Sequence, residues 1–220
     1  MSAHPMARHL DNGLAALKPE LSPAARGHLL RYLDEMTRWN SAYNLTAIRT
    51  PSEMVTRHLL DSLALLPVLD VVPGFPDARI LDVGAGAGLP GLVLAIAEPR
   101  LRVTVLDSNG KKARFMRHAQ RTLKLDNVEV AECRVEDWRP VAPYDGITSR
   151  AFASLADFVA ATATLLAPGG SEGGVWVAMK GKLDAAELAA VPAGARIRET
   201  RRLRVPGLDE ERHAVIAVQD

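Results

Sequence analysis

The sequence contains one cysteine, Cys133, and few aromatic residues, which make up 5% of its 220 residues. A single cysteine excludes an internal disulfide framework and a cysteine-rich metal cluster, and we expect no metal site. The longest uncharged apolar stretches, 89–97 and 158–167, are about half as long as a membrane-spanning helix needs. The first residues include no continuous apolar run of the signal-peptide type. We therefore expect a cytoplasmic protein, neither secreted nor embedded in a membrane.

An excess of either charge is also absent, because 27 Lys and Arg residues stand against 26 Asp and Glu residues. This balance gives no global attraction to nucleic acid, so any such binding needs local clusters. The hydrophobic fraction of 48% and the charged fraction of 24% are typical of a globular protein. The length predicts one main fold with a modest extension, and no feature demands a second subunit, so we expect a monomer.

The chain changes its pattern near residue 75, which predicts a helical extension over 1–75 and a main domain over 76–220. Ser22 and Pro23 are suited to the cap and first position of a helix, and apolar residues at helical spacing continue it to about Trp39. Ser52 is predicted to cap a second helix that runs to Leu66 and ends at Pro67.

From residue 79 onward, β-rich runs alternate with helical stretches. This alternation predicts an α/β fold with a mostly parallel, Rossmann-like sheet covered on both faces. The predicted strands are 79–84, 102–107, 128–132, 146–151 and 175–180, followed by an antiparallel hairpin of 198–206 and 213–219, which makes seven. Five arginines within 196–204 are interpreted as charges that protect an exposed edge strand. Sheets of this kind bind ligands at the carboxyl ends of their strands.

A glycine-rich segment, 82–91, follows the first predicted strand. Glycines between a strand and a helix allow left-handed dihedrals and a close approach of the backbone to a ligand. Gly86, Gly88 and Gly91 satisfy G-x-G-x-x-G, and Asp107 follows Gly86 by 21 residues, which is also a dinucleotide pattern. A nicotinamide-dependent oxidoreductase is therefore one interpretation.

Three features favour S-adenosylmethionine over a dinucleotide: the run D-x-G-x-G-x-G from Asp82, an acidic residue, Glu136, taken as the end of the third strand, and L-x-P-G-G at 166–170. Together they resemble the class I methyltransferases. In that class the acidic residue after the second strand, here Asp107, accepts hydrogen bonds from the ribose hydroxyls. Capping of the following helix is the alternative role for Asp107. Asp82 is expected either to orient the glycine loop or to contact the ammonium group of the cofactor.

Further motifs occur in one order along most of the chain. They are Trp39-Asn40, 43–46, 57–63, 86–91, 106–116, 134–138, 149–155, 180–181 and 211–213. From about residue 25 to 218 the sequence resembles the ribosomal RNA small subunit methyltransferase G family, also called the glucose-inhibited division protein B family. The resemblance implies methyl transfer from S-adenosylmethionine to N7 of one guanine in bacterial 16S ribosomal RNA, free or in the small subunit or its assembly intermediate. It also implies cofactor contacts at Gly84, Gly86, Leu89, Asp107, Val135, Glu136 and Arg150.

The expected chemistry agrees with an acceptor that needs no deprotonation. Guanine N7 carries a lone pair in the plane of the base, so positioning can replace a general acid or base, and we expect neither. The D/N-P-P-Y/F motif of amino methylation is missing after the fourth strand, where residues 149–152 read Ser-Arg-Ala-Phe. Cys133 beside Arg134 could supply the thiolate for carbon-5 methylation of cytosine, although a buried structural role is the favoured interpretation.

Candidate RNA contacts lie at strand ends and near the glycine loop: Arg134, Lys180, Arg212, His213, Lys111 and Lys112. Arg114, Arg117, Arg121 and Lys124 form a further basic helix face that is either a phosphate-binding stripe or a solvated surface. His58 and Asp61 are expected to lie on a polar helix face against the sheet, with contact to RNA or cofactor as the alternative. Other open readings are methylation of another RNA or a small molecule, and an RNA-binding protein without catalysis.

Overall fold

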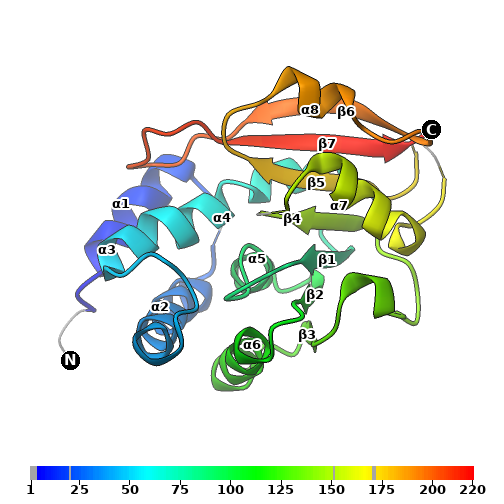
Figure 1. Ribbon diagram of the computed structural model, residues 1–220. Helices are drawn as coiled ribbons and strands as arrows, with labels where there is room; N and C mark the ends of the chain where they lie inside the picture. The colour runs from blue at the N-terminus through cyan, green and yellow to red at the C-terminus, as the bar shows by residue number, and fades with distance from the viewer. Residues whose placement is uncertain (1–3, 20, 151, 170–171) are drawn as a thin grey trace.

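The computed structural model describes residues 4–19, 21–150, 152–169 and 172–220. Ala151 and Gly170, which belong to two of the sequence motifs, lie outside the described residues. Within this part of the chain, helices pack on both sides of a central sheet, and the N-terminal helices gather beside one of its faces (Figure 1). No helix in the described ranges is long and apolar enough to cross a membrane.

The sheet has the order β3-β2-β1-β4-β5-β7-β6. Pairing is parallel from β3 to β5 and antiparallel where β7 joins β5 and β6. The prediction of a mostly parallel seven-stranded sheet with a terminal antiparallel hairpin is thereby confirmed. The strands are β1 Arg79–Val83, β2 Arg102–Leu106, β3 Val128–Ala131, β4 Gly146–Ser149, β5 Val175–Lys180, β6 Ala195–Arg202 and β7 His213–Gln219. The arginine-rich β6 is the edge strand, as its charge predicts.

The two faces of the sheet are covered by different helices. Successive side chains of a strand point to opposite faces, so in β1 Ile80 joins one apolar cluster and Leu81 the other. The first cluster includes the N-terminal helices with α5 (Gly91–Ala97) and α6 (Gly110–Leu123), and the second includes α7 (Leu155–Thr162) with partial cover from α8 (Ala185–Ala189). Short 3₁₀ turns η3 (Val135–Asp137) and η4 (Ala163–Leu165) complete this half.

The N-terminal helices differ from the predicted boundaries. Helix α1 covers Ala7–Leu17, and α2 runs over Pro23–Tyr43, four residues beyond the predicted end, to a left-handed Asn44. The predicted cap Ser52 is wrong: the side chain of Thr50 accepts from the Glu53 amide, and Pro51 is the first helical residue. Thr50 followed directly by Pro51 satisfies the preferences for the N-cap and for the first helical position, two residues before the predicted cap.

The predicted second helix is not one regular helix. It consists of α3 (Pro51–Met54), a π-helical stretch η1 (Val55–Leu60) and α4 (Asp61–Leu63). Pro67 does not end it, because this residue lies in a following 3₁₀ helix, η2 (Leu66–Val71), where its missing amide hydrogen is tolerated near the start. The π-helical stretch is buried at Val55, Thr56, His58, Leu59 and Leu60.

Helix α2 supports the glycine loop from the far side. Tyr32 is fully buried, and its hydroxyl donates a 2.6 Å hydrogen bond to the carbonyl of Ala87. Its ring also lies 6.0 Å from that of Phe115 in α6. A buried carbonyl in an irregular loop needs a partner, and this one is supplied by a residue 55 positions away in sequence.

We expect Tyr32→Phe to lower the free energy of unfolding by about 1 to 3 kcal/mol, because the buried Ala87 carbonyl loses its hydrogen-bond donor. Urea denaturation measures the change. Tyr43→Phe is the matched control, since Tyr43 is 44% exposed on the same helix, and its effect should stay within about 0.5 kcal/mol. Equal stability of both variants would show that the hydroxyl of Tyr32 does not stabilise the loop.

Candidate functional site

Two cavities lie beside each other at the carboxyl ends of the parallel strands. The loop cavity, of about 180 Å³, is lined by Val83, Gly84, Leu106, Asp107, Ser108, Cys133, Arg134, Val135, Glu136 and Phe152. The arginine cavity, of about 370 Å³, is lined by Ile48, Arg57, His58, Asp61, Arg150, Met179, Lys180, Gly181 and Arg212. Strand β4 lies between β1 and β5, so Arg150 directly after β4 stands at the boundary between the cavities.

The glycine loop gives the loop cavity a wall of bare backbone. Gly84, Gly86 and Gly88 all have positive φ, between 61° and 88°, which L side chains rarely adopt. A side chain at Gly84 would meet no atom within 4 Å, so the space beside this backbone is open to a ligand. Gly91 has another role: a Cβ there would come within 2.6 Å of Val105, so glycine allows α5 to pack against β2.

Asp107 holds the glycine loop and does not cap the following helix. One carboxylate oxygen accepts a 2.9 Å bond from the Gly86 amide, and the other accepts a 2.8 Å bond from the Asn109 amide. The N-cap of α6 is Asn109, whose side-chain oxygen accepts hydrogen bonds from the backbone amides of Lys111 and Lys112. A carboxylate can accept about four hydrogen bonds, so Asp107 retains capacity for a ligand in the loop cavity.

Asp82 is the buried carboxylate behind the loop. One oxygen accepts a 2.7 Å bond from the Gly91 amide, and the other, Oδ1, has no partner among the described residues. Burial is the largest effect and raises the pKa of Asp82 to about 7, against the lowering effects of the Gly91 amide and Arg150. Of the two expected roles, orientation of the loop is therefore observed, and Oδ1 remains an available acceptor.

The opposite wall of the loop cavity comes from η3. The prediction that Glu136 ends the third strand is wrong. Strand β3 ends at Ala131, and the chain then turns into η3, which contains Glu136. Glu136 is exposed in the cavity beside the buried Val135. Arg134 lines this cavity too, and not the arginine cavity. Burial and Asp137 raise the pKa of the Cys133 thiol, which disfavours the thiolate that cytosine methylation requires.

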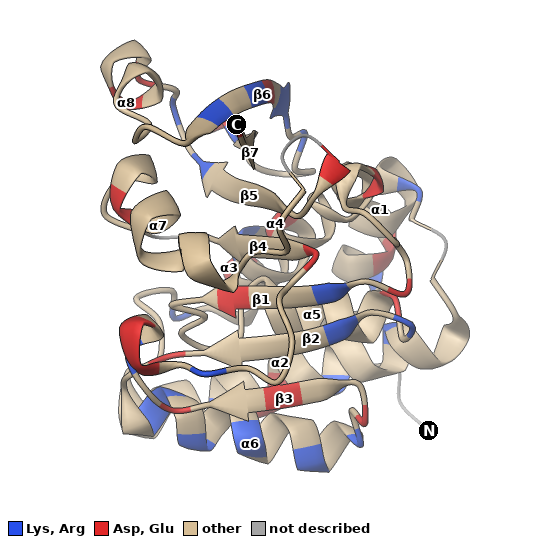
Figure 2. Ribbon diagram, turned by 90° about the vertical axis from the view of Figure 1, so that its right-hand side faces the viewer, with Lys and Arg blue, Asp and Glu red and all other residues tan. Residues whose placement is uncertain are grey.

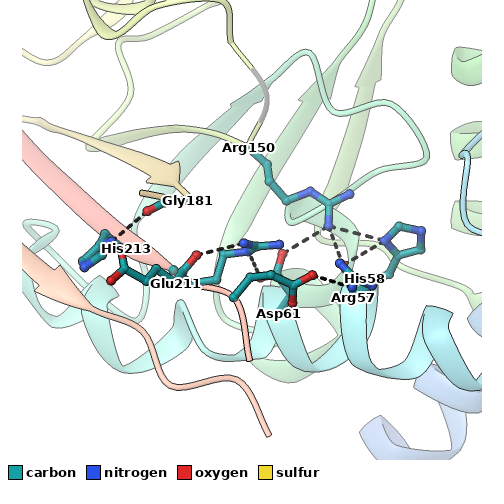
Figure 3. Close-up of polar contacts among 9 residues, drawn as sticks. Arg57, His58, Asp61, Arg150, Gly181, Glu211 and His213 are labelled. Atoms are coloured by element: carbon teal, nitrogen blue, oxygen red, sulfur yellow. Dashed lines mark hydrogen bonds and ion pairs between the residues drawn. The ribbon is translucent and has the colours of Figure 1, made fainter. Parts of the chain in front are cut away.

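One buried carboxylate organises the arginine cavity. Asp61 at the start of α4 is 2% exposed. Its Oδ1 lies 3.1 Å from Nε of Arg212, and its Oδ2 lies 3.3 Å from Nη1 of Arg150 (Figure 3). Arg150 also donates to the carbonyl of Arg57 at 3.0 Å. The guanidiniums come from β4 and from the segment before β7, so this contact joins the helix to two parts of the sheet.

His58 is a neutral structural neighbour of this pair. Its Nδ1 lies 2.9 Å from the carbonyl of Arg57, and its Nε2 lies 3.0 Å from the hydroxyl of Thr46, so both ring nitrogens are engaged. Burial, followed by the charge of Arg150, lowers the pKa of His58 to about 4. The expectation of a polar helix face against the sheet is met for His58 and Asp61, and neither is poised as a proton acceptor.

The remaining candidate residues divide between the two cavities and their surroundings. Lys180 lines the arginine cavity and pairs with Glu187 at 2.6 Å. His213 starts β7 opposite Lys180, with Nδ1 2.8 Å from the carbonyl of Gly181. Nζ of Lys112 lies 3.6 Å from Asp107, beside the glycine loop, and Lys111 is exposed. Leu89 is buried in the core and does not line either cavity.

Sequence reasoning missed Arg57 and Ile48 as cavity residues. Arg57 lies on the π-helical stretch and pairs with Glu210 at 2.6 Å, and Ile48 lies in the loop before α3. Ile48 lies between the motifs 43–46 and 57–63, and Arg57 begins the second of them; the proximity of both residues to β5 depends on a helix path that no local sequence pattern indicates. Lysines and arginines also occur along α6, which lies beside β3 and far from β5 and β7 (Figure 2).

We expect Asp82→Asn to change how stability depends on pH. A folded pKa near 7, above the ordinary 3.8, means that the folded state binds the proton more tightly, so stability present at low pH is lost as pH rises towards 7. Relative to the native chain, the variant should gain up to about 3 kcal/mol between pH 5 and 8, measured by urea unfolding. Asp126→Asn, at an exposed position, is the control. A constant difference between native chain and variant would contradict the raised pKa.

Comparison with known proteins identifies the family. The model of the family described as rRNA small subunit methyltransferase G (GidB) matches residues 26–215. A ribosomal RNA small subunit methyltransferase G of Xanthomonas campestris is 52% identical over 211 residues, covering 96% of this chain and 94% of the relative. The protein of the same name from Stenotrophomonas maltophilia is 50% identical over 219 residues, covering 98% of each.

Solved structures agree on the fold. TrmN from Thermus thermophilus superposes with a TM-score of 0.57 at 20% identity, covering 76% of this chain and 53% of that one. Magnesium protoporphyrin IX methyltransferase from Synechocystis, with bound SAM, gives 0.58 at 12% identity, covering 86% and 97%. These likenesses confirm the class I methyltransferase fold expected from the sequence. The chain belongs to the ribosomal RNA small subunit methyltransferase G family and is an S-adenosylmethionine-dependent methyltransferase.

Proposed function

We propose that this chain transfers a methyl group from S-adenosylmethionine to N7 of one guanine in bacterial 16S ribosomal RNA. The observation that carries the proposal is the position of the two cavities: one with acidic and glycine-rich walls and one with four cationic side chains, separated by β4. A cofactor with an adenosine moiety suits the first, and a polyanionic acceptor suits the second. The family match over residues 26–215 makes ribosomal RNA the acceptor proposed.

The loop cavity fits the cofactor by its donor and acceptor set. Asp107 offers acceptors for two ribose hydroxyls, and Glu136 with the backbone of Val135 suits the exocyclic amine and ring edge of adenine. The positive-φ backbone at Gly84 and Gly86 leaves room for the cofactor chain to pass. Leu89 supports the loop from the core, and Arg150 would reach the cofactor from the boundary between the cavities.

The cofactor when bound supplies a methyl group on a sulfonium, which a nitrogen lone pair attacks directly. The residues around the arginine cavity agree with such an acceptor, because His58 is neutral with both nitrogens engaged and Asp61 is held by two arginines. Guanine N7 needs no base, so the chain's task is to exclude water and align nucleophile, methyl carbon and sulfur. Positioning of this kind can lower a barrier by about 7 to 11 kcal/mol.

RNA contacts are proposed at Lys180, Arg212 and His213 around the arginine cavity and at Arg134, Lys111 and Lys112 around the loop cavity. The basic face of α6 extends this region and is a candidate path for the phosphate backbone. We further propose that the chain acts as a monomer, because no feature of the sequence demands a second subunit. We also propose that residues 1–75 are a helical extension packed on the 76–220 methyltransferase domain, and that the protein acts in the cytoplasm.

The test is methyl transfer by the purified chain to free 16S RNA, to an assembly intermediate and to the small subunit. Methylated RNA is treated with borohydride and aniline, which cleave at N7-methylguanine, and the cleavage is mapped by primer extension. A single new stop in one of these substrates is the expected result. Transfer to another RNA or to a small molecule alone would overturn the acceptor assignment, and NAD binding without S-adenosylmethionine binding would overturn the reaction.

We expect Asp107→Ala to weaken S-adenosylmethionine binding at least tenfold by calorimetry, because the ribose loses a charged acceptor and the Gly86 amide loses its partner. Asp126→Ala serves as the control, since this exposed residue precedes β3 at the opposite edge of the sheet. An unchanged dissociation constant for Asp107→Ala would remove Asp107 from the cofactor site.

A further inference from the structure

The contact between Asp61, Arg150 and Arg212 is unusual in its charge balance. Among the residues that the structure describes, Asp61 is the one carboxylate that lines the arginine cavity, and it faces two guanidiniums at once. The other two cations there have partners of their own, Arg57 with Glu210 and Lys180 with Glu187. The arginine pair is therefore only half neutralised, and its excess positive charge faces the cavity.

Both guanidiniums keep donors that the protein does not use. Arg150 engages its Nη1 group, and Arg212 engages Nε with Asp61 and Nη1 with the carbonyl of Glu211. No acceptor for the Nη2 group of either arginine occurs among the described residues. Their side chains are about a quarter exposed, whereas that of Asp61 is 3% exposed. The carboxylate thus stands behind the pair, and the free donors are on the accessible side.

The backbone that carries Asp61 supports a specialised role. Asp61 follows the π-helical stretch η1 directly. Such stretches are rare and frequently occur at functional sites, because the extra residue in the turn redirects the side chains that follow. Here His58 and Asp61 are both buried, and their side chains point from the helix towards Arg150, as Figure 3 shows.

We propose that Asp61 is a positioning residue for methyl transfer: it holds Arg150 and Arg212 as a paired guanidinium clamp for an RNA phosphate next to the target guanine. Forked N–H donors match phosphate oxygens, and a fixed pair sets both the place and the orientation of the group it binds. Arg150 directly follows β4, the strand between the two cavities, so the same carboxylate would align the acceptor with a methyl donor bound in the loop cavity. This inference rests on the proposed function.

The test distinguishes an effect on the alignment of the bound RNA from an effect on RNA affinity. Asp61→Asn keeps the size of the side chain but removes a negative charge from a cationic cavity. RNA binding should therefore stay equal or tighten up to about threefold at low salt, with a slightly steeper salt dependence. The single-turnover rate of methyl transfer at saturating RNA and cofactor should fall at least tenfold, because the guanidiniums lose their common anchor. Calorimetry should give a dissociation constant for S-adenosylmethionine within about threefold of the native value.

The control is Asp70→Asn, which removes a carboxylate from an ion pair with Arg201 outside both cavities and should change neither rate nor affinity. A second variant, Arg212→Lys, keeps the charge and Asp61 but removes the fork, and its rate should fall similarly. The double variant should be no slower than the slower single variant, because both changes disable one clamp.

Three results would overturn the inference while native transfer to RNA stands. They are an unchanged rate in Asp61→Asn, a loss of RNA affinity in parallel with a lower melting temperature, and a cofactor dissociation constant weakened as much as the rate. The last result would assign the clamp to the carboxylate of the cofactor. Absence of transfer by the native chain would instead contradict the proposed function itself.

Discussion

The loop between β1 and α5 depends on hydrogen bonds with side chains of other elements, besides those that the Leu106 carbonyl of β2 accepts from the Gly84 and Ala85 amides. Three residues supply them: Asp82 accepts from Gly91, Asp107 accepts from Gly86, and Tyr32 donates to Ala87. These partners come from β1, from the end of β2 and from α2. A loop with three left-handed glycines would otherwise lose its unique conformation, because glycine gains the most entropy on unfolding. The shape of the loop cavity therefore rests on contacts from three distant segments.

Three aspartates near the carboxyl ends of the parallel strands have different roles, because their side chains have different partners. The carboxylate of Asp82 accepts a bond from one backbone amide and has no ion pair with an arginine among the described residues. The effect of burial therefore exceeds the stabilisation of the charged form, and the pKa of Asp82 rises. Asp107 lies at the surface of the loop cavity and accepts from two amides. Asp61 is as buried as Asp82 but is paired with two arginines, which makes a buried charge tolerable. The same residue type thus orients a loop, offers acceptors to a ligand, or anchors a pair of cations.

Local signals predicted some elements well and others poorly for identifiable reasons. The mostly parallel sheet of seven strands and its terminal hairpin followed from apolar runs that alternate with helical stretches. The segment from residue 51 to 71 was wrong in detail, since no residue pattern distinguishes a π-helical turn from an α-helical one. Glu136 was taken as the end of the third strand, whereas the pairing of β3 with β2 ends at Ala131 and Glu136 lies in η3.

The sequence by itself determined the fold class, the glycine loop and the family, because these depend on periodicity and on motifs whose order along the chain is distinctive. Tertiary structure alone decided which charges share a cavity. Arg150 and Arg212 are 62 residues apart, and nothing in the sequence around either arginine indicates that they share a partner. The ends of β4 and of the segment before β7 bring them to one buried carboxylate on α4. The same holds for Arg134, which the sequence groups with the RNA candidates and which the fold places in the loop cavity with Gly84 and Asp107. Ion pairs across a sheet depend on distance and burial, and neither is encoded locally.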